Sequence, residues 1–459
     1  MKKTLLFLSA FILFNACDEE PIDPNNPNNP GNGEYVVEDI TPTGDENFMT
    51  KGSEYIFDQD KLHTFHLYLP ESSLQAIDAD PTAEQYVAGT LKFEGETVSA
   101  VGVRYKGSIG GFVNCVSGND WANPSGSKIC TKLSMKIKIN WNGSDTKFFG
   151  LKKLQLHSQN LDPSQLHDRL GYHLFREMGV PAPRSIHARL MINDEYYGLY
   201  SLIEQIDGRF VKENFSDDDG NLYKEVWPID MNGNPLAEWA YLNALKTNED
   251  ENPNASIMLN FAQDISNADS IGLRSIIENK MNLNEILSYI VVDRMIRNDD
   301  GAFHWYCNGG DCSNHNYYWY EEPNNDKLHL IPWDLDNAFE NIMSDANPVT
   351  PIADAWGETT SNCQPFAYGW FGTQQRSAAC DKLTGGWASY KTEYQALRNE
   401  FINGAFAATE VNALIDTWAA QIRDATIEAS TEHSDALSFS EWEAAVNTLK
   451  NQLNYARTH

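Results

Sequence analysis

NDDG at 298–301, HNYYWY at 315–320 and PWDLD at 332–336 are the stretches that decide the fold, because each sets polar side chains beside apolar ones. Phosphoryl transfer needs a carboxylate that takes the hydroxyl proton and an amide oxygen for a metal ion. It also needs a second carboxylate on the metal that bridges the phosphates. Protein kinases present these groups in the order helix, Asp, Asn, strand, Asp, and this chain repeats that order. The three stretches therefore predict a site for a metal-bound nucleotide.

The apolar pattern around this segment predicts mixed helix and strand. Strands are expected at 63–70, 90–93, 98–107, 132–140, 185–192, 196–207, 315–322 and 327–336. Helices are expected from Ser164 to Met178, over 283–298, and through most of 390–457. Residues 208–280 are polar and variable, and the pattern assigns them no element. About 425 residues follow the N-terminal segments, which is enough for one large two-lobed unit or for two domains.

RYKGS at 104–108, FFGLKKLQLHSQNLDPSQLHDRL at 148–170 and YYGLYSLIEQID at 196–207 complete a set of motifs with the three stretches above. Together they resemble the spore-coat-protein-H (CotH) kinase-like family over roughly residues 57–345. The resemblance implies an α+β, atypical protein-kinase-like fold with two lobes and a helical C-terminal region. It also implies a secreted or surface-exposed kinase that uses ATP.

Four segments are expected along the chain. Residues 1–17 form a lipoprotein signal peptide with its lipobox cysteine, and residues 18–50 form a tether rich in acidic residues, Pro and Asn that cannot bury enough apolar surface to fold. Residues 51–345 form the CotH kinase-like domain. Residues 346–459 form the helical C-terminal part of the larger lobe.

The catalytic base is expected at Asp300, which matches the Asp of the family's Asn-Trp-Asp-Gly run. Asp299 stands where the family has Trp, which places a second carboxylate at the site and would raise one pKa by repulsion. The loop from Asp300 to Asn316 is longer than the kinase-type spacing. Asp311 is therefore a rival base, and Asp300 is preferred because Asp311 lies inside a small cysteine loop.

The metal ligands implied by the resemblance are Asn316 and Asp334, with Asp336 as an additional ligand. Carboxylate and amide oxygens suit Mg²⁺ or Mn²⁺, and Ca²⁺ is an alternative ion.

The nucleotide phosphates require a lysine steadied by a carboxylate from the following helix. Lys132 matches the family's strand lysine, and Asp168 lies on the helix where the family commonly has Glu. Arg104 and Lys106 lie on a strand that enters a loop able to cover the phosphates, and the sequence does not decide between Lys132 and Lys106. Glu204 ends a strand where a hinge would meet the adenine.

The N-terminus predicts export, because Lys2 and Lys3 precede an apolar run over 5–14 that ends shortly before Cys17. The run is too short for a permanent membrane span. A small residue before Cys17 resembles a lipobox, so we expect a lipid anchor as the only membrane contact, with display on the outer-membrane surface. An ordinary secretory signal is the alternative.

Six cysteines remain after Cys17, and their short separations favour sequential pairing. The expected disulfides are Cys115–Cys130, Cys307–Cys312 and Cys363–Cys380. A zinc site is the weaker alternative, because no CxxC or HxxxH spacing is present.

The formal charge of −31 would repel nucleic acid, so none is expected as a partner. The expected partners are a nucleotide and a protein acceptor at the cell surface. Two other functions remain open. Asp299 and the long loop favour a catalytically silent surface-binding lipoprotein on a kinase-like scaffold. The many Trp and acidic residues of an exported protein favour a carboxylate-dependent glycoside hydrolase.

Overall fold

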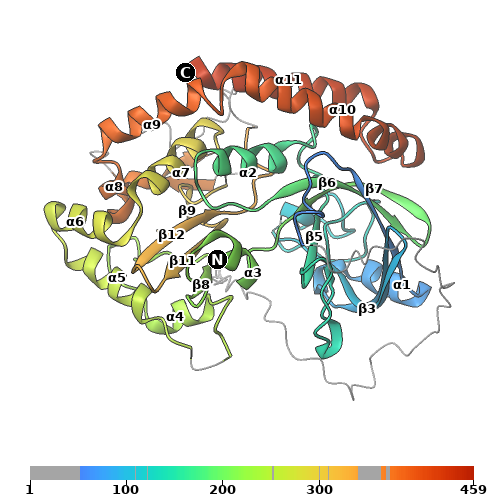
Figure 1. Cartoon of the computed structure of the whole chain (residues 1–459), viewed down its shortest axis with the longest axis horizontal. Coiled ribbons are helices and arrows are strands. Elements are labelled where there is room, and N and C mark those ends of the chain that lie inside the picture. Colours follow the sequence, from blue (N-terminus) through green and yellow to red (C-terminus); the bar gives the residue numbers. More distant parts are fainter. Residues whose placement is uncertain are drawn as a thin grey trace, which may run out of the picture.

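The structure, a computed structural model, describes residues 52–108, 110–120, 122–250, 253–298, 300–308, 310–339, 363–368 and 373–458. The N-terminal signal and tether, Cys17, Asp299 and the boundary expected at 345 lie outside these residues. Within them the chain forms two lobes with separate apolar cores (Figure 1). This arrangement confirms the predicted α+β, two-lobed kinase-like fold.

The small lobe is a closed barrel in the strand order β1-β2-β3-β4-β5-β7-β6. Its strands are β1 (His63–Tyr68), β2 (Val87–Phe93), β3 (Glu96–Tyr105), β4 (Met135–Lys138), β5 (Lys153–His157), β6 (Ser185–Ile192) and β7 (Glu195–Ile203). The chain also forms α1 (Glu71–Ala79) and the short 3-10 turns η2 (Pro81–Ala83), η3 (Gly110–Phe112) and η4 (Trp141–Gly143). Alternate residues point inward, as Met135 and Ile137 of β4 do, and the parallel pairing of β1 with β6 closes the barrel.

The large lobe contains two small sheets with helices around them. The sheet β12-β11-β8 comprises β8 (Leu222–Lys224), β11 (Tyr317–Glu322) and β12 (Lys327–Pro332). The sheet β10-β9-β14-β13 comprises β9 (Trp305–Asn308), β10 (Asp311–Ser313), β13 (Phe366–Tyr368) and β14 (Thr373–Arg376). The helices are α2 (His167–Glu177), α3 (Gly208–Asn214), α4 (Glu238–Asn243), α5 (Ser256–Asn267), α6 (Ser270–Lys280), α7 (Leu283–Met295), η6 (Ala378–Cys380), α8 (Lys382–Trp387) and α9 (Lys391–Asn403).

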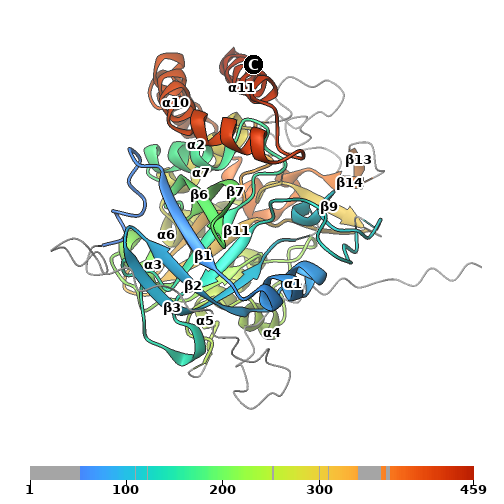
Figure 2. The ribbon, with the colours of Figure 1, turned by 90° about the vertical axis from the view of Figure 1, so that its right-hand side faces the viewer.

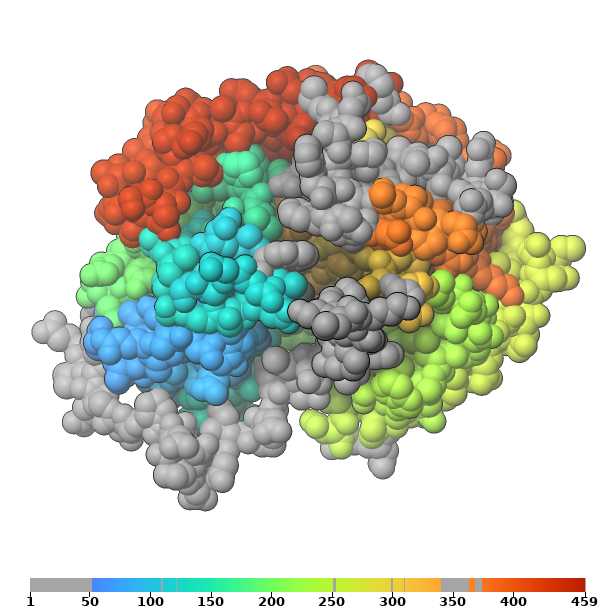
Figure 3. Space-filling model, turned by 180° about the vertical axis from the view of Figure 1, so that it is seen from behind, coloured from blue at the N-terminus to red at the C-terminus, as the bar shows by residue number. Residues whose placement is uncertain are grey.

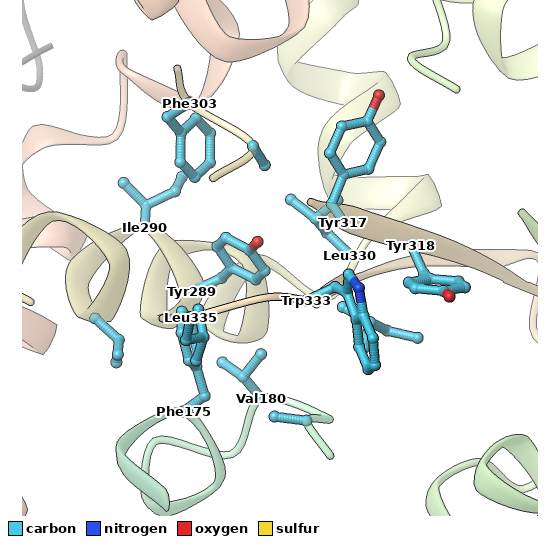
Figure 4. Packing of buried hydrophobic residues seen from close by; sticks show 14 of the residues in the cluster. Phe175, Val180, Tyr289, Ile290, Phe303, Tyr317, Tyr318, Leu330, Trp333 and Leu335 are labelled. Atoms are coloured by element: carbon cyan, nitrogen blue, oxygen red, sulfur yellow. The ribbon is translucent and has the colours of Figure 1, made fainter. Parts of the chain in front are cut away.

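Helix α7 runs through the middle of the large lobe and leads directly to the NDDG stretch. Its residues are apolar on nearly every side, which is the pattern of a helix with neighbours all around. Tyr289 packs against Phe175 of α2, with 5.0 Å between ring centroids. Leu335 of the PWDLD stretch belongs to the same cluster (Figure 4). Gly171 of α2 leaves room for the Leu335 side chain, because a Cβ at residue 171 would lie only 2.7 Å from Leu335 Cδ1.

Two long C-terminal helices, α10 (Ala408–Glu432) and α11 (Phe439–Thr458), lie across both lobes. Figures 2 and 3 show them along one side of the molecule, above the barrel and the large lobe. The hydroxyl of Tyr196 in β7 donates to the carbonyl of Ala425 at 3.0 Å, and Arg189 of β6 pairs with Glu428 at 2.5 Å. Helix α10 therefore covers the outer face of β6 and β7.

The expected strands are present, with ends shifted by a few residues. The helix expected from Ser164 begins at His167, because Asp162 and Ser164 form a turn in which Asp162 Oδ2 accepts from the His167 backbone N–H at 2.7 Å. The sequence pattern did not predict α1, β5, β9, β10, β13, β14 or α8. Residues 208–280, which received no element, contain α3, β8, α4, α5 and α6.

The three expected disulfides, Cys115–Cys130, Cys307–Cys312 and Cys363–Cys380, are all present. In the part of the chain that the structure describes, no helix has the length and apolar character needed to cross a bilayer.

Candidate active site

Asp300, His315 and Asn316 meet between α7 and β11. Asp300 lies in the loop after α7, and the other two directly precede β11. The amide nitrogen of Asn316 donates to Asp300 Oδ2 at 2.8 Å and to the Asp300 carbonyl at 3.0 Å. His315 Nε2 lies 2.6 Å from Asp300 Oδ1. Both carboxylate oxygens are thus fixed in direction.

Electrostatics favour the ionised form of Asp300. Burial alone would raise the pKa of Asp300, but the charge of His315 and hydrogen bonds from His315 and Tyr306 outweigh it and hold that pKa below its ordinary value. Burial alone would lower the pKa of His315, and the charge of Asp300 raises it instead. The side chains of His315 and Asp300 are 38% and 26% exposed, so a substrate group has access to the pair.

The backbone of Asn316 ties three strands together. Its φ is 60°, in the left-handed region that Asn tolerates better than most residues. Its N–H donates to Glu225 Oε1 at 3.2 Å, directly after β8, and its carbonyl accepts from the N–H of Trp333 at 3.2 Å, directly after β12. The side chain that contacts Asp300 is therefore placed by the sheet and not by the loop alone.

Asp334 joins this group from the end of β12. Its N–H donates to the hydroxyl of Tyr172 on α2 at 2.9 Å, and its φ is 55°. Burial and then Asp300 raise the pKa of Asp334, while Lys106 and Lys224 oppose the rise. The carboxylates of Asp300 and Asp334 thus lie within electrostatic reach of each other, and folding gathers the three central residues of the prediction.

The sequence left Lys106 and Lys132 as alternative phosphate lysines, and in the structure the two have different neighbours. Lys106 Nζ, directly after β3, lies 2.6 Å from His157 Nε2 and 5.5 Å from the centre of the Trp333 ring. Burial, with a smaller contribution from Lys224, lowers the pKa of Lys106 to about 8, and Asp334 opposes that shift. Lys106 therefore lies over the ring of Trp333 and within electrostatic reach of Asp334.

Lys132 lies in the segment before β4, not in a strand. Its Nζ donates to the carbonyl of Leu199 at 2.8 Å, and its charged neighbours are Asp162 and Asp435. These contacts fix Lys132 to β7 and to the segment after α10. Its interactions with charged groups do not include Asp334.

Arg104 and Asp168 lie close to Lys106. Arg104 is paired with Glu84, which also accepts from the N–H of Gly107 at 2.9 Å and so anchors the start of the glycine-rich loop. Asp168 Oδ2 lies 3.8 Å from Nδ1 of His157. Burial, and next the charge of Asp334, raise the pKa of Asp168 well above its ordinary value.

Glu204 and Asp336 make other contacts. Glu204 follows β7 at the passage into the large lobe, and its carboxylate is paired with Arg184 at 2.5 Å. The carbonyl of Asp336 accepts from His167 Nδ1 at 2.8 Å, and its carboxylate accepts from Asn337 at 3.1 Å.

Asp311, the rival base, lies in β10 opposite Asn308, with an exposed side chain inside the Cys307–Cys312 loop. Asp311 therefore belongs to the β9–β10 hairpin and pairs with Asn308, which is not a member of the group formed by Asp300, His315 and Asn316.

Sequence reasoning missed four groups at the site: His157, Lys224, Glu225 and His315. The sequence offered a signal for both histidines, because His157 lies in LQLHSQ and His315 in HNYYWY, which are parts of the motifs that carry the family resemblance. Lys224 is the cross-strand partner of Tyr318, whose ring is edge-on to Trp333 at 5.9 Å. The position of Lys224 next to Tyr318 follows from the pairing of β8 with β11 and from no sequence motif.

The oxygen atoms at the site fit a divalent cation that is shared with phosphates. Among the described residues, no three His, Cys, Asp or Glu side chains gather into a metal site by themselves. Mg²⁺ in phosphate-processing sites is usually held by one or two protein ligands together with the phosphates. Asp334 offers a carboxylate and Asn316 an amide oxygen, because its amide nitrogen is turned to Asp300.

Comparison with known proteins adds one match. The family model described as CotH kinase protein matches residues 103–458, a span that includes Lys106, Asp300, His315, Asn316 and Asp334. No curated protein matches the chain.

Proposed function

The chain belongs to the CotH kinase family, and from this premise we propose that it transfers the γ-phosphoryl group of ATP to a hydroxyl group of a protein outside the cytoplasm. The observation that carries the proposal is the gathering of Asp300, Asn316 and Asp334 beside Lys106. These residues come from both lobes and supply the base, the metal ligands and the phosphate lysine of the kinase reaction.

Asp300 is the proposed base. It is ionised, and its oxygens are directed by His315 and Asn316. In this role it accepts the hydrogen bond of the acceptor hydroxyl and takes that proton as the oxygen attacks the γ-phosphorus. The ion pair with His315 keeps Asp300 deprotonated before the acceptor binds. Asp311 is less suited, since it lies on the β9–β10 hairpin.

Lys106 is the proposed phosphate lysine. Its ammonium group lies over Trp333, the residue before Asp334, so it can neutralise phosphate charge next to the metal ligand. Asp334 and Asn316 would hold Mg²⁺ or Mn²⁺, which supplies charge neutralisation for the triphosphate. The role predicted for Lys132 is weaker, because its Nζ is bound to Leu199.

The cellular setting is part of the proposal. The signal-like run before Cys17 favours a lipid-anchored protein at the outer-membrane surface, and three disulfides favour an oxidising compartment. The acceptor would then be a surface or periplasmic protein.

The decisive experiment incubates the purified mature protein with γ-labelled ATP, Mg²⁺ or Mn²⁺ and periplasmic or surface proteins. We expect label transfer by the wild type, loss of transfer in Asp300→Asn and Asp334→Ala, and retention in Asp311→Asn, the matched control. A wild type that binds ATP and metal without transferring label would favour the silent scaffold. Equal transfer by the wild type and Asp334→Ala would contradict the metal assignment.

A further inference from the structure

His157 lies between the phosphate lysine and the carboxylate of α2. Its Nε2 is 2.6 Å from Lys106 Nζ, and its Nδ1 is 3.8 Å from Asp168 Oδ2. The kinase pattern has a lysine and an acidic residue in direct contact. In this chain an imidazole stands between the two.

The chemistry of the partners determines which nitrogen of His157 carries the proton. A protonated lysine has three donors and no acceptor, so His157 Nε2 must accept. The proton of a neutral ring then sits on Nδ1, the nitrogen that faces Asp168. Burial and the charge of Lys106 lower the pKa of His157 well below its ordinary value, which agrees with a neutral ring.

The surroundings hold the ring in this orientation. His157 ends β5 and pairs with Ser201 of β7, so its backbone is part of the barrel. Its ring is edge-on to Trp333, with 5.6 Å between centroids. His157 therefore contacts residues at the end of β3, after β12 and on α2. These three elements carry Lys106, Trp333 and Asp168.

We propose that His157 is a positioning residue. Its neutral, Nδ1-protonated imidazole holds Lys106 over Trp333 and links that lysine to Asp168. This inference rests on the proposed function, because it deepens the role given there to Lys106. It assigns the histidine no contact with substrate. It implies that α2 steers the phosphate lysine through the ring and not through a direct ion pair.

The first test measures the ring itself and needs no activity. In the full-length mature protein with ¹⁵N-labelled histidine, long-range ¹H–¹⁵N correlation spectra distinguish a protonated from an unprotonated ring nitrogen. We expect His157 to be the Nδ1–H tautomer in the wild type and to lose that preference in Lys106→Met. A wild-type ring protonated at Nε2 would overturn the inference, whatever the activity.

The second test uses kinetics. His157→Phe keeps a ring against Trp333 but removes the acceptor, and we expect kcat/KM for ATP to fall on the order of 100-fold from misplacement of Lys106. His157→Gln retains an acceptor oxygen and should recover most of that loss. His63→Gln is the matched control, since His63 is a buried histidine of the same barrel that bonds to the carbonyl of Tyr55.

The outcomes separate the two proposals. If the wild type transfers phosphate and His157→Phe equals it, the inference is wrong and the proposed function stands. Equal losses in His157→Phe and His157→Gln, with both variants folded, would also contradict the acceptor role. If the wild type transfers nothing, the proposed function fails, and the tautomer spectrum alone decides the role of His157.

Discussion

His315 and Asp300 are joined by a contact of 2.6 Å between Nε2 and Oδ1, which links the HNYYWY and NDDG motifs. The fourteen residues between them include the strands β9 and β10 and the Cys307–Cys312 disulfide. The contact therefore closes a loop, and it also sets the charge state of the proposed base.

Replacement of His315 by Gln should change the pH dependence of transfer. The amide retains a donor but has no charge, so burial dominates and the pKa of Asp300 rises. A base acts when deprotonated, so the acidic limb of the pH profile of kcat/KM should move to higher pH. His329→Gln, at a histidine that contacts Glu285 at 2.8 Å, should leave the limb in place. An unmoved limb in His315→Gln would contradict the role of the ion pair.

Lys106 should matter for nucleotide binding and Lys132 should not. We expect Lys106→Met to lower kcat/KM for ATP on the order of 100-fold, because charge next to Asp334 is lost. Lys132→Met, which removes a bond to Leu199, should lower stability and change kcat/KM only a few-fold. Isothermal titration with ATP and Mn²⁺ measures the binding side, and the reverse ranking would restore Lys132 as the phosphate lysine.

The alkaline side of the pH profile should also report Lys106. Its pKa is lowered to about 8, mainly by burial, so the charged form predominates below that pH and is lost above it. The kcat/KM of the free enzyme should therefore fall as pH rises through about 8. In Lys106→Arg the limb should disappear, because the guanidinium stays charged. A wild-type profile that is flat to pH 10 would contradict a charged Lys106 in the reaction.

Asp293 should make stability depend on pH. It is buried in α7, accepts from Asn298 at 3.0 Å, and burial raises its pKa to about 7. The folded state thus holds a proton that the unfolded state releases near pH 4, so stability decreases as pH rises from about 4 to about 7. Asp293→Asn keeps the acceptor and should flatten this decrease, with a gain at pH 8 of at most about 4 kcal/mol. Urea unfolding at pH 5 and 8 measures it, and Asp264→Asn, an exposed residue of α5, is the control.

Arg169 should be critical for stability because its buried guanidinium donates to neutral oxygen acceptors. Its guanidinium is fully buried, donates to the Gln59 carbonyl at 2.6 Å and to Gln421 Oε1 at 2.7 Å, and lies 4.4 Å from the centre of the Trp418 ring. Removal leaves several buried polar groups without partners, so Arg169→Leu should cost about 3 kcal/mol of unfolding free energy.

The control for Arg169 is Arg423→Leu on α10, whose side chain is 53% exposed and pairs with Asp424. It should change stability by less than about 1 kcal/mol in urea unfolding. Similar effects of the two substitutions would show that the buried guanidinium does not tie α2 to α10.

The order of motifs was enough to predict that Asp300, Asn316 and Asp334 would converge, because a kinase-type order fixes which loops meet at one end of a sheet. The choice between Lys106 and Lys132 could not be made in this way. It depends on where β4 begins, and β4 begins at Met135, after Lys132. His157 was invisible as a functional residue because its partners are 51 residues earlier and 11 residues later in the chain.

Two helices between residues 208 and 280 that were not predicted, α5 and α6, have recognisable signals in the sequence. Met258, Phe261, Ala262 and Ile265 follow helical spacing on the buried face of α5, and Asp269 caps α6 by accepting from Gly272. The surrounding polar residues hid this pattern, since α6 is exposed on much of its surface. Tertiary pairing alone determines β8, a strand of three residues.

The placement of α10 against β6 and β7 has a consequence for biosynthesis. Strands of the barrel leave the ribosome more than two hundred residues before the helix that covers them, since Tyr196 bonds to Ala425 and Arg189 to Glu428. Domains otherwise tend to fold in the order in which they are made. Here the outer face of β6 and β7 stays uncovered until α10 has been translated, so a product truncated before α10 lacks that cover on its barrel.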